Sequence, residues 1–309
     1  MGLYYAKASR QNVRSHLRQL SLFCVAFKQQ FLPVSKNTLL AFLELMSKTC
    51  NFGHLQSVLS SIRFVHQLKK LQFCGDDFEV TVFLRGLKRK LSKPARQVLP
   101  ITPEILILMY EHIDITKPID LAHWTAMLFA FRLLFRKSSI APKSFSSFNP
   151  RTELSREKVI LVDETVLVCQ NFSKTDQYMA SVRVIPLTRT PIKALDPVLH
   201  YRMLVQGNRC SGNVPAFSYN VGNVIKCVTY NSFTKYLKTL LHLVGLNPDD
   251  WSGHSFRRGG ATLLYKLGVD PMTIQAAGDW SSDTFLRYLD VNFDRLWQAQ
   301  RSMATYSCT

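Results

Sequence analysis

Apolar residues recur at helical spacing through the first hundred positions of the chain. The pattern is clearest in residues 55–71, with apolar side chains at Leu55, Val58, Leu59, Ile62 and Val65. Intervals of three and four residues are typical of a helix with one buried face. Similar runs at 9–28, 35–46 and 78–91 predict three more helices, so we expect a compact four-helix domain.

The helical pattern breaks at a basic, proline-containing linker, residues 93–99. Directly after it, Thr102, Pro103 and Glu104 have the order of a helix start. Threonine is a good N-cap, proline suits the first helical position, and an acid there complements the helix dipole. We therefore expect two domains, 1–96 and 97–309.

The second domain mixes two periodicities. Short β-rich runs at 159–162 and 166–169 flank Asp163 and Glu164 and predict a hairpin, and residues 183–186 add a third strand. Helical spacing predicts helices at 121–135, 196–205, 232–244, 255–267 and 271–277. The expected fold class is mainly α with a small antiparallel β-sheet: an all-helical N-terminal domain followed by an α+β domain.

Positive charge is concentrated in the N-terminal domain. The chain has a formal net charge of +18, and residues 1–100 carry 16 Lys or Arg against 4 Asp or Glu, a balance of +12. Such a concentration favours a polyanionic partner, because cationic side chains neutralise phosphates and release counterions. The most basic run, which we call the basic strap, comprises Arg85, Lys88, Arg89, Lys90, Lys93 and Arg96. We predict that the strap contacts double-stranded DNA.

Composition argues against several other classes of protein. No uninterrupted apolar run approaches the roughly 20 residues of a membrane-spanning helix, and we expect no membrane association. The seven cysteines are scattered and form no CxxC pair, so structural zinc and a disulfide framework are not expected. We expect no metal and no cofactor.

Candidate chemistry lies near the C-terminus. The segment GHSFRRGG places His254 and Arg257 three residues apart, on one face of a predicted helix, and Tyr288 follows about thirty residues later. Breaking a phosphodiester without metal requires a nucleophile, donors for the phosphate oxygens, and a general acid for the leaving oxygen. A tyrosine nucleophile would conserve the bond energy as a phosphotyrosine, from which DNA can be rejoined.

With these motifs the chain resembles tyrosine recombinases and integrases, and most closely the eukaryotic transposon-borne recombinases of the DIRS and Crypton type. The resemblance covers nearly the whole chain, with residues 1–96 similar to the core-binding domain and 97–309 to the catalytic domain. It implies a site-specific DNA recombinase of mobile-element origin that works through a 3′-phosphotyrosine. It also implies a tetramer on DNA assembled through a C-terminal helix, and a location in the nucleus, or in the cytoplasm if the source is not eukaryotic.

The resemblance also implies a set of site residues. The second arginine and its histidine correspond to Arg257 and His254, and the nucleophile corresponds to Tyr288. The first arginine corresponds to Arg136, with Arg132 one turn earlier as the rival. The polar loop SKTDQ carries Lys174, the expected general acid for the 5′ oxygen. Nine residues before the tyrosine, where many members have His or Trp, stands Asp279, with Trp280 beside it as the other candidate for that role.

Two positions depart from the family pattern. Ser139 stands where an acidic residue usually braces the first arginine, and Asp279 would bring a carboxylate towards the phosphate. These departures leave catalytic activity open. The alternative is a DNA-binding protein that keeps the recombinase clamp and has lost the chemistry. A type IB topoisomerase shares the chemistry but resembles this chain less, because the N-terminal domain matches the recombinase type.

Overall fold

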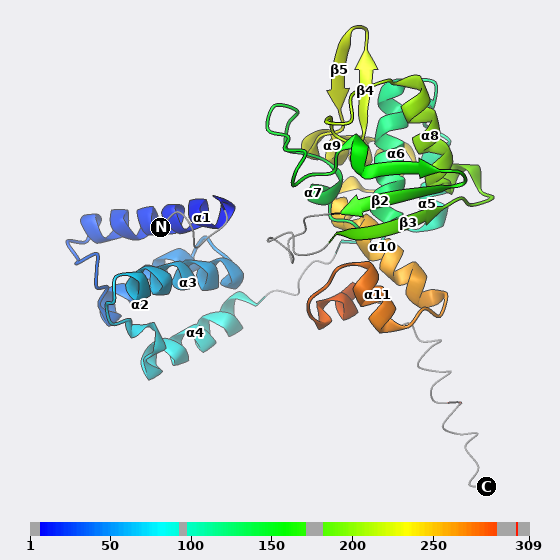
Figure 1. Cartoon of the computed structure of the whole chain (residues 1–309). Helices are drawn as coiled ribbons and strands as arrows, with labels where there is room; N and C mark the ends of the chain where they lie inside the picture. Colours follow the sequence, from blue (N-terminus) through cyan, green and yellow to red (C-terminus); the bar gives the residue numbers. More distant parts are fainter. Residues whose placement is uncertain (1–6, 93–97, 171–181, 289–300, 302–309) are drawn as a thin grey trace. The chain divides into compact units, whose positions relative to one another are not determined.

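The computed structural model describes residues 7–92, 98–170, 182–288 and 301, which form two compact units, Met1–Arg96 and Gln97–Thr309 (Figure 1). Both units are mainly helical, and the second also contains small antiparallel sheets. This confirms the predicted fold class.

The N-terminal unit consists of helices α1 (Lys7–Ala26), α2 (Lys36–Ser47), α3 (Phe52–Leu68) and α4 (Phe78–Leu91), with a short 3₁₀ helix η1 (Cys74–Asp76) before α4. The side chains of Ser35 and Asn51 accept hydrogen bonds from backbone N–H groups in the first turns of α2 and α3, which fixes where these helices begin. The apolar stripes meet in one core that includes Leu39, Leu43 and Ile62, all fully buried. Four helices were expected here, and their positions agree with the structure to within a few residues.

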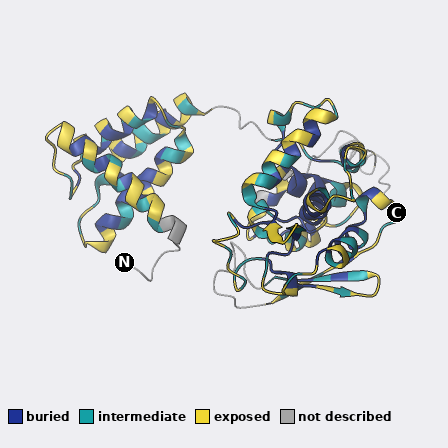
Figure 2. Cartoon of the chain, turned by 90° about the horizontal axis from the view of Figure 1, so that it is seen from above, coloured by how far each residue is buried: buried dark blue, intermediate teal, exposed yellow. Residues whose placement is uncertain are grey.

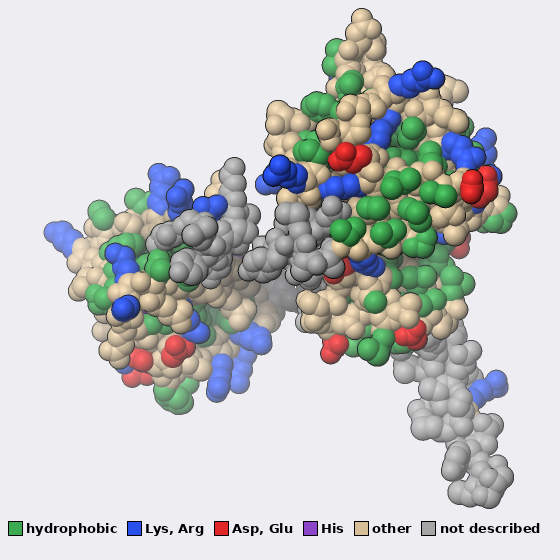
Figure 3. Space-filling model, in the orientation of Figure 1, with side chains coloured by type: hydrophobic (Ala, Val, Ile, Leu, Met, Phe, Trp, Pro, Cys, Tyr) green, Lys and Arg blue, Asp and Glu red, His purple; other side chains and the backbone are tan. Residues whose placement is uncertain are grey.

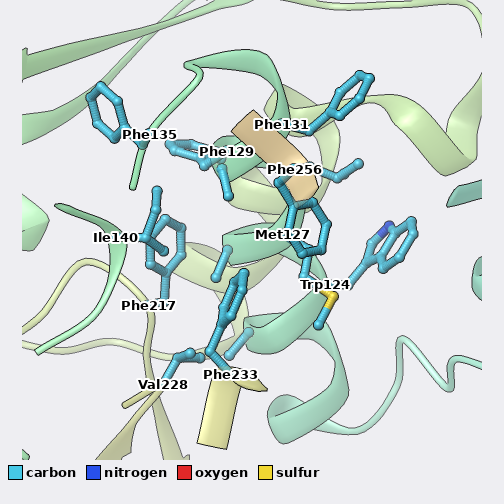
Figure 4. Close-up of a cluster of buried hydrophobic side chains, with 14 of the residues drawn as sticks. Trp124, Met127, Phe129, Phe131, Phe135, Ile140, Phe217, Val228, Phe233 and Phe256 are labelled. Atoms are coloured by element: carbon cyan, nitrogen blue, oxygen red, sulfur yellow. The ribbon is translucent and has the colours of Figure 1, made fainter. Parts of the chain in front are cut away.

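The second unit is built around α6 (Pro118–Arg132), a helix with buried side chains at every position from Leu121 to Phe131. A helix that is apolar on all sides must be enclosed by other elements. The enclosing helices are α5 (Pro103–Tyr110), α7 (Lys137–Ile140), α8 (Pro197–Gly207), α9 (Tyr230–Leu243) and α10 (Gly253–Lys266), and α11 (Pro271–Ala277) packs against α10. Figure 2 shows the buried centre of this unit, and Figure 4 shows the aromatic side chains that fill it. Thr102 caps α5 as predicted, with its hydroxyl accepting from the Ile105 N–H.

The predicted strands are present as β1 (Val159–Val162), β2 (Thr165–Gln170) and β3 (Arg183–Thr188), joined in the antiparallel order β1-β2-β3. A second hairpin, β4 (Ser218–Val221) with β5 (Val224–Cys227), was not predicted. Its signal in the sequence is the pair Gly222-Asn223 between two short apolar runs, with Gly222 at a φ of +58°. Gly-Asn is a typical two-residue hairpin connection and could have revealed it.

Helix α6 differs from the prediction at both ends. It begins at Pro118 and ends at Arg132 rather than spanning 121–135. The chain leaves the helix because Leu134 adopts a φ of +54°, a left-handed conformation that is uncommon for a bulky residue. The Phe135 N–H then bonds back to the Ala130 carbonyl. This turn directs the following residues towards α10.

Candidate active site

Helix α10 carries the His-x-x-Arg motif and is anchored on several sides. A capping box between Ser252 and Ser255 fixes its first turn. Phe256 is fully buried and packs edge-to-face against Phe233 of α9, with ring centroids 5.4 Å apart (Figure 4). The core therefore fixes the rotation of α10 about its axis, and the side chains next to Phe256 point away from Phe233.

The glycine pair of the motif permits close backbone contact. A Cβ at Gly259 would lie 1.7 Å from the Ile101 carbonyl oxygen, and one at Gly260 would lie 2.3 Å from the Phe131 carbonyl oxygen. Side chains do not fit at such distances, so only glycine allows α10 to pack on both backbones. At both positions the group that approaches the glycine most closely is backbone.

Arg257 is almost completely buried, with 2% of its surface exposed. Its Nη1 donates a 2.5 Å hydrogen bond to the Leu134 carbonyl oxygen, which the left-handed turn after α6 presents. The guanidinium also lies over the indole ring of Trp280, with Cζ 3.7 Å from the ring centroid. A carbonyl at its edge and an indole against its face fix the plane of the guanidinium. Such preorganisation is what stabilisation of a phosphoryl transition state requires.

Arg258, the next residue, has a different role. Its Nη1 donates to the Val98 carbonyl oxygen at 2.8 Å, and the Ile101 N–H donates to the Ser255 carbonyl oxygen at 3.0 Å. These bonds tie the first residues of the second unit to α10. Of the two neighbouring arginines, Arg257 is the one in contact with Trp280.

His254 and Arg136 lie on elements that meet near Arg257. His254 is exposed in the first turn of α10, three residues before Arg257. Arg136 is half-buried at the N-cap position of α7, two residues after the turn at Leu134. The side chain of Lys137 covers Gly253, since a Cβ added there would lie 2.7 Å from its Cδ. The turn that bears Arg136 is thus packed against the start of α10.

The rival first arginine, Arg132, is exposed in the last turn of α6. Ser139 is half-buried in α7, and its backbone N–H donates to the Arg136 carbonyl oxygen at 2.8 Å. The position where the family pattern expects an acid therefore lies within the same short turn as Arg136.

Of the two candidates for the His or Trp position, Trp280 is the residue in contact with Arg257. Its ring is 8% exposed and also packs against Phe285, with centroids 6.0 Å apart. Asp279 is half-buried and adopts a φ of +54°. Trp280 therefore both anchors the last helices and completes the surroundings of Arg257.

Sequence reasoning missed Arg183, the first residue of β3. Its Nη2 donates to the Ala277 carbonyl oxygen at the end of α11, at 2.7 Å. Burial lowers the pKa of this guanidinium, and the nearby Asp279 carboxylate opposes that shift. No sequence pattern joins two residues 94 positions apart, so this contact could be found only in the folded chain.

The predicted nucleophile, Tyr288, is the last residue of the 3₁₀ helix η5 (Asp283–Tyr288), which packs against α10 and α11. Its backbone therefore follows directly on the elements that hold Arg257. The side chain of Tyr288 lies outside the described part of the structure, as do the whole of Lys174 and the C-terminal residues Phe293, Leu296 and Trp297.

The basic strap is described over part of its length. Arg85, Lys88, Arg89 and Lys90 are all exposed on α4, while Lys93 and Arg96 lie outside the described residues. On the face of the N-terminal unit seen in Figure 3, Lys and Arg side chains clearly outnumber acidic ones. Arg85 and Lys88 also line a groove of about 360 Å³ between α3 and α4. The part of the strap on α4 therefore presents a cationic surface to solvent.

A second basic groove borders the candidate active site. It has a volume of about 620 Å³ and is lined by Lys137, Asn231, Thr234, Lys235, Lys238, Thr239 and His242. Lys137 has its ammonium 3.9 Å from the centre of the Tyr230 ring and also covers Gly253 beside His254. Positive charge thus continues from the start of α10 along one side of α9.

The described residues include no cluster of three or more His, Cys, Asp or Glu side chains placed to hold a metal ion. Among the same residues, no helix has both the length and the apolar composition needed to cross a bilayer.

Comparison with known proteins identifies the segment that contains α10. Residues 151–295 match the model of the phage integrase family. The match covers somewhat less than half of the chain. The matched segment contains His254, Arg257, Trp280 and Tyr288, and it supports the predicted resemblance to tyrosine recombinases and integrases. A comparison with curated proteins finds no match.

Solved structures of integrases and recombinases share the fold. The Tn1549 transposon integrase in complex with circular intermediate DNA has a TM-score of 0.60 at 12% identity, covering 97% of this chain and 95% of that one. The XerH site-specific recombinase in a post-cleavage complex has a TM-score of 0.58 at 14% identity, covering 95% and 77%. A lambda integrase dimer bound to a core site has a TM-score of 0.57 at 13% identity, covering 94% and 90%. At these identities the likeness establishes a common fold.

Proposed function

We propose that this chain belongs to the phage integrase family and is a site-specific DNA recombinase that cuts and rejoins strands through a 3′-phosphotyrosine at Tyr288. One observation carries the proposal. The buried guanidinium of Arg257 is held between the Leu134 carbonyl and the Trp280 ring, beside the turn that bears Arg136. A fixed, buried guanidinium close to a turn that bears a second arginine is suited to a phosphate whose negative charge increases during reaction.

In the proposed reaction the Tyr288 oxygen attacks phosphorus and the bond to the 5′ oxygen breaks. That oxygen leaves with a proton from a general acid, the role proposed for Lys174. His254 assists proton transfer or binds the phosphate, and Arg136 and Arg257 neutralise the non-bridging oxygens. Attack of a 5′ hydroxyl on the phosphotyrosine then restores a phosphodiester and releases the tyrosine. Bond energy is conserved throughout, so rejoining needs no external energy source.

The proposed partner is double-stranded DNA. The exposed part of the basic strap and the groove beside α9 both offer cationic side chains to phosphates. The structures of similar fold include a transposon integrase in complex with circular intermediate DNA, a site-specific recombinase bound to a palindromic substrate and an integrase dimer bound to a core site. We further propose a mobile-element origin of the DIRS or Crypton type, tetramer assembly on DNA through the C-terminal helix, and a nuclear location in a eukaryotic host, or a cytoplasmic one otherwise.

A suicide substrate tests the chemistry. A duplex nicked next to the cleavage position loses a short fragment after attack, so the covalent protein–DNA adduct accumulates. We expect an adduct with the wild-type chain, detected as a denaturation-resistant shift on a gel, and none with Tyr288→Phe. Tyr219→Phe, which removes a phenol from β4, is the matched control and should still form the adduct.

The second candidate function is DNA binding without cleavage. It is favoured by Ser139 and Asp279, which replace residues that the family pattern expects near the phosphate. The same experiment separates the two functions. Wild-type protein that binds its DNA site but forms no adduct on any nicked substrate would establish the binding function and contradict the recombinase.

A further inference from the structure

Arg183 joins two parts of the second unit that are distant in sequence. It begins β3, which pairs with β2 in register from Thr165 opposite Thr188 to Gln170 opposite Arg183. Its Nη2 donates to the Ala277 carbonyl oxygen at 2.7 Å, at the end of α11. The carbonyls in the last turn of a helix have no partners within the helix and carry partial negative charge, so a guanidinium is well suited to this position. The bond therefore fastens α11 to the sheet.

The turn that follows α11 determines where Trp280 lies. The N–H groups of Asp279 and Trp280 bond back to Ala276 and Gln275, at 3.1 Å each. Asp279 has a left-handed φ, and a Cβ at Gly278 would lie 1.6 Å from the Trp280 ring. The ring is thus folded back over its own turn. A displacement of this turn would carry the indole with it.

The indole is in turn a principal contact of Arg257. The guanidinium Cζ is 3.7 Å from the Trp280 ring centroid, while its Nη1 bonds to Leu134. The series of contacts therefore runs from Arg183 through the turn at 277–280 to the face of the candidate catalytic guanidinium. The Asp279 carboxylate of the same turn is near enough to Arg183 to oppose the lowering of its pKa by burial.

We propose that Arg183 is a positioning residue for the candidate active site, an inference that rests on the proposed function. By holding the Ala277 carbonyl, it fixes the turn that presents Trp280 to Arg257. On this view Asp279, which lies in the same turn, serves the site as a counter-charge for Arg183.

The first test observes Arg257 directly and needs no DNA. Protons over the face of an indole resonate upfield, so the Arg257 Nε–Hε signal should be shifted upfield in an arginine-selective NMR spectrum. Its assignment comes from its loss in Arg257→Lys. Arg183→Met keeps the apolar stem and removes every donor, and we expect it to move the Arg257 signal towards the position of exposed arginines. Arg183→Lys keeps one donor and the charge and should restore most of the upfield shift.

Two further variants complete the set. Asp279→Asn removes the counter-charge while retaining a residue type that tolerates left-handed φ, so it should fold and give a smaller change of the Arg257 signal in the same direction. The matched control is Arg202→Ala, because Arg202 of α8 likewise donates to a carbonyl, that of Asp163, and pairs with a carboxylate, Glu164. The control should leave the Arg257 signal unchanged.

The second test measures chemistry in the full chain. At saturating nicked DNA, Arg183→Met should slow formation of the covalent adduct by about 10- to 100-fold, the effect expected when a catalytic group is displaced by about 1 Å. Its Kd for DNA should stay within about twofold of that of Arg202→Ala, since both variants lose one positive charge. A wild-type chain without adduct would refute the proposed function, while the NMR test would still decide the role of Arg183.

The inference is overturned if folded Arg183→Met and Asp279→Asn both keep the wild-type Arg257 signal. It is equally overturned if Arg183→Met and Arg202→Ala slow adduct formation to the same extent. Should Arg183→Met fail to fold, Asp279→Asn and Arg183→Lys still provide the comparison of the Arg257 signal.

Discussion

Replacing Gly259 by alanine tests whether the glycine pair of α10 is required by backbone packing. The new Cβ would lie 1.7 Å from the Ile101 oxygen and 2.8 Å from the Ile101 carbonyl carbon. Both atoms belong to backbone, so no side-chain rotation relieves the clash. Helix α10 and the segment 98–101 would have to move apart by more than 1 Å for ordinary van der Waals contact, by our rough estimate.

The expected magnitude follows from what that movement breaks. Overpacking costs about 1–3 kcal/mol. Separation would also break the hydrogen bonds from the Ile101 N–H to the Ser255 oxygen and from the Leu99 N–H to the Asp250 oxygen, each worth about 1 kcal/mol. Alanine in a helix recovers about 1 kcal/mol through its higher propensity. The net prediction is a loss of about 2–4 kcal/mol in the free energy of unfolding.

Urea unfolding followed by tryptophan fluorescence measures this loss in the second unit alone, because all four tryptophans, Trp124, Trp251, Trp280 and Trp297, lie beyond residue 97. The matched control is Gly207→Ala in the last turn of α8, where an added Cβ meets nothing within 4 Å. We expect the control to be neutral or to stabilise by up to about 1 kcal/mol. If Gly259→Ala were as stable as this control, the close approach of α10 to Ile101 would be refuted.

Further predictions concern DNA binding, pH and the indole. Neutralising Lys88, Arg89 and Lys90 together should weaken DNA binding and reduce the steepness of the plot of log K against log salt concentration by up to about 2.7. If a titration of Kd against salt gave an unchanged slope, the strap would not be part of the DNA interface. Burial lowers the pKa of His123 and His200 from the ordinary value of 6.5. Below that pH the unfolded chain therefore binds more protons than the folded chain, so the stability of the second unit should be full above about pH 6.5 and fall as the pH drops below it. Urea unfolding at about pH 7.5 and 5.5 measures this change in the free energy of unfolding. Trp280→Leu should keep an apolar anchor beside Phe285 but lose the flat contact with Arg257, so adduct formation should slow about tenfold or more while the Kd for DNA changes little.

Local sequence signals predicted much of the fold because they depend on neighbouring residues. Thr102 and the pair Asp270-Pro271 are residue types that favour the start of a helix, and α5 and α11 begin at these positions. The end of α6 was not visible, because Leu134 has no sequence mark of a left-handed turn. Its conformation is imposed by tertiary packing, with a side chain that is 1% exposed among Ala261, Ile274 and Trp280.

The candidate site likewise combines features that local sequence reveals with features that only tertiary packing decides. The His-x-x-Arg spacing named Arg257, but it could not say which groups would orient that guanidinium or the one of its neighbour Arg258. Their orientations follow from the packing of α10, where Phe256 enters the core and Arg257 and Arg258 turn towards different carbonyls. Trp280 and Asp279 were equal alternatives in the sequence, and only the contact with the guanidinium separates them.

Three arginines of this unit share one mode of attachment, and it explains why their partners leave no mark in the sequence. Arg257, Arg258 and Arg183 each donate to a backbone carbonyl of a distant segment, at Leu134, Val98 and Ala277. Any residue type supplies a carbonyl, so the acceptor is defined by backbone conformation and not by side-chain identity. The donors must be long cationic side chains, whereas the acceptors can vary in type as long as the turn is kept. A motif therefore reports the donors of such a site, and the structure is needed to find what orients them.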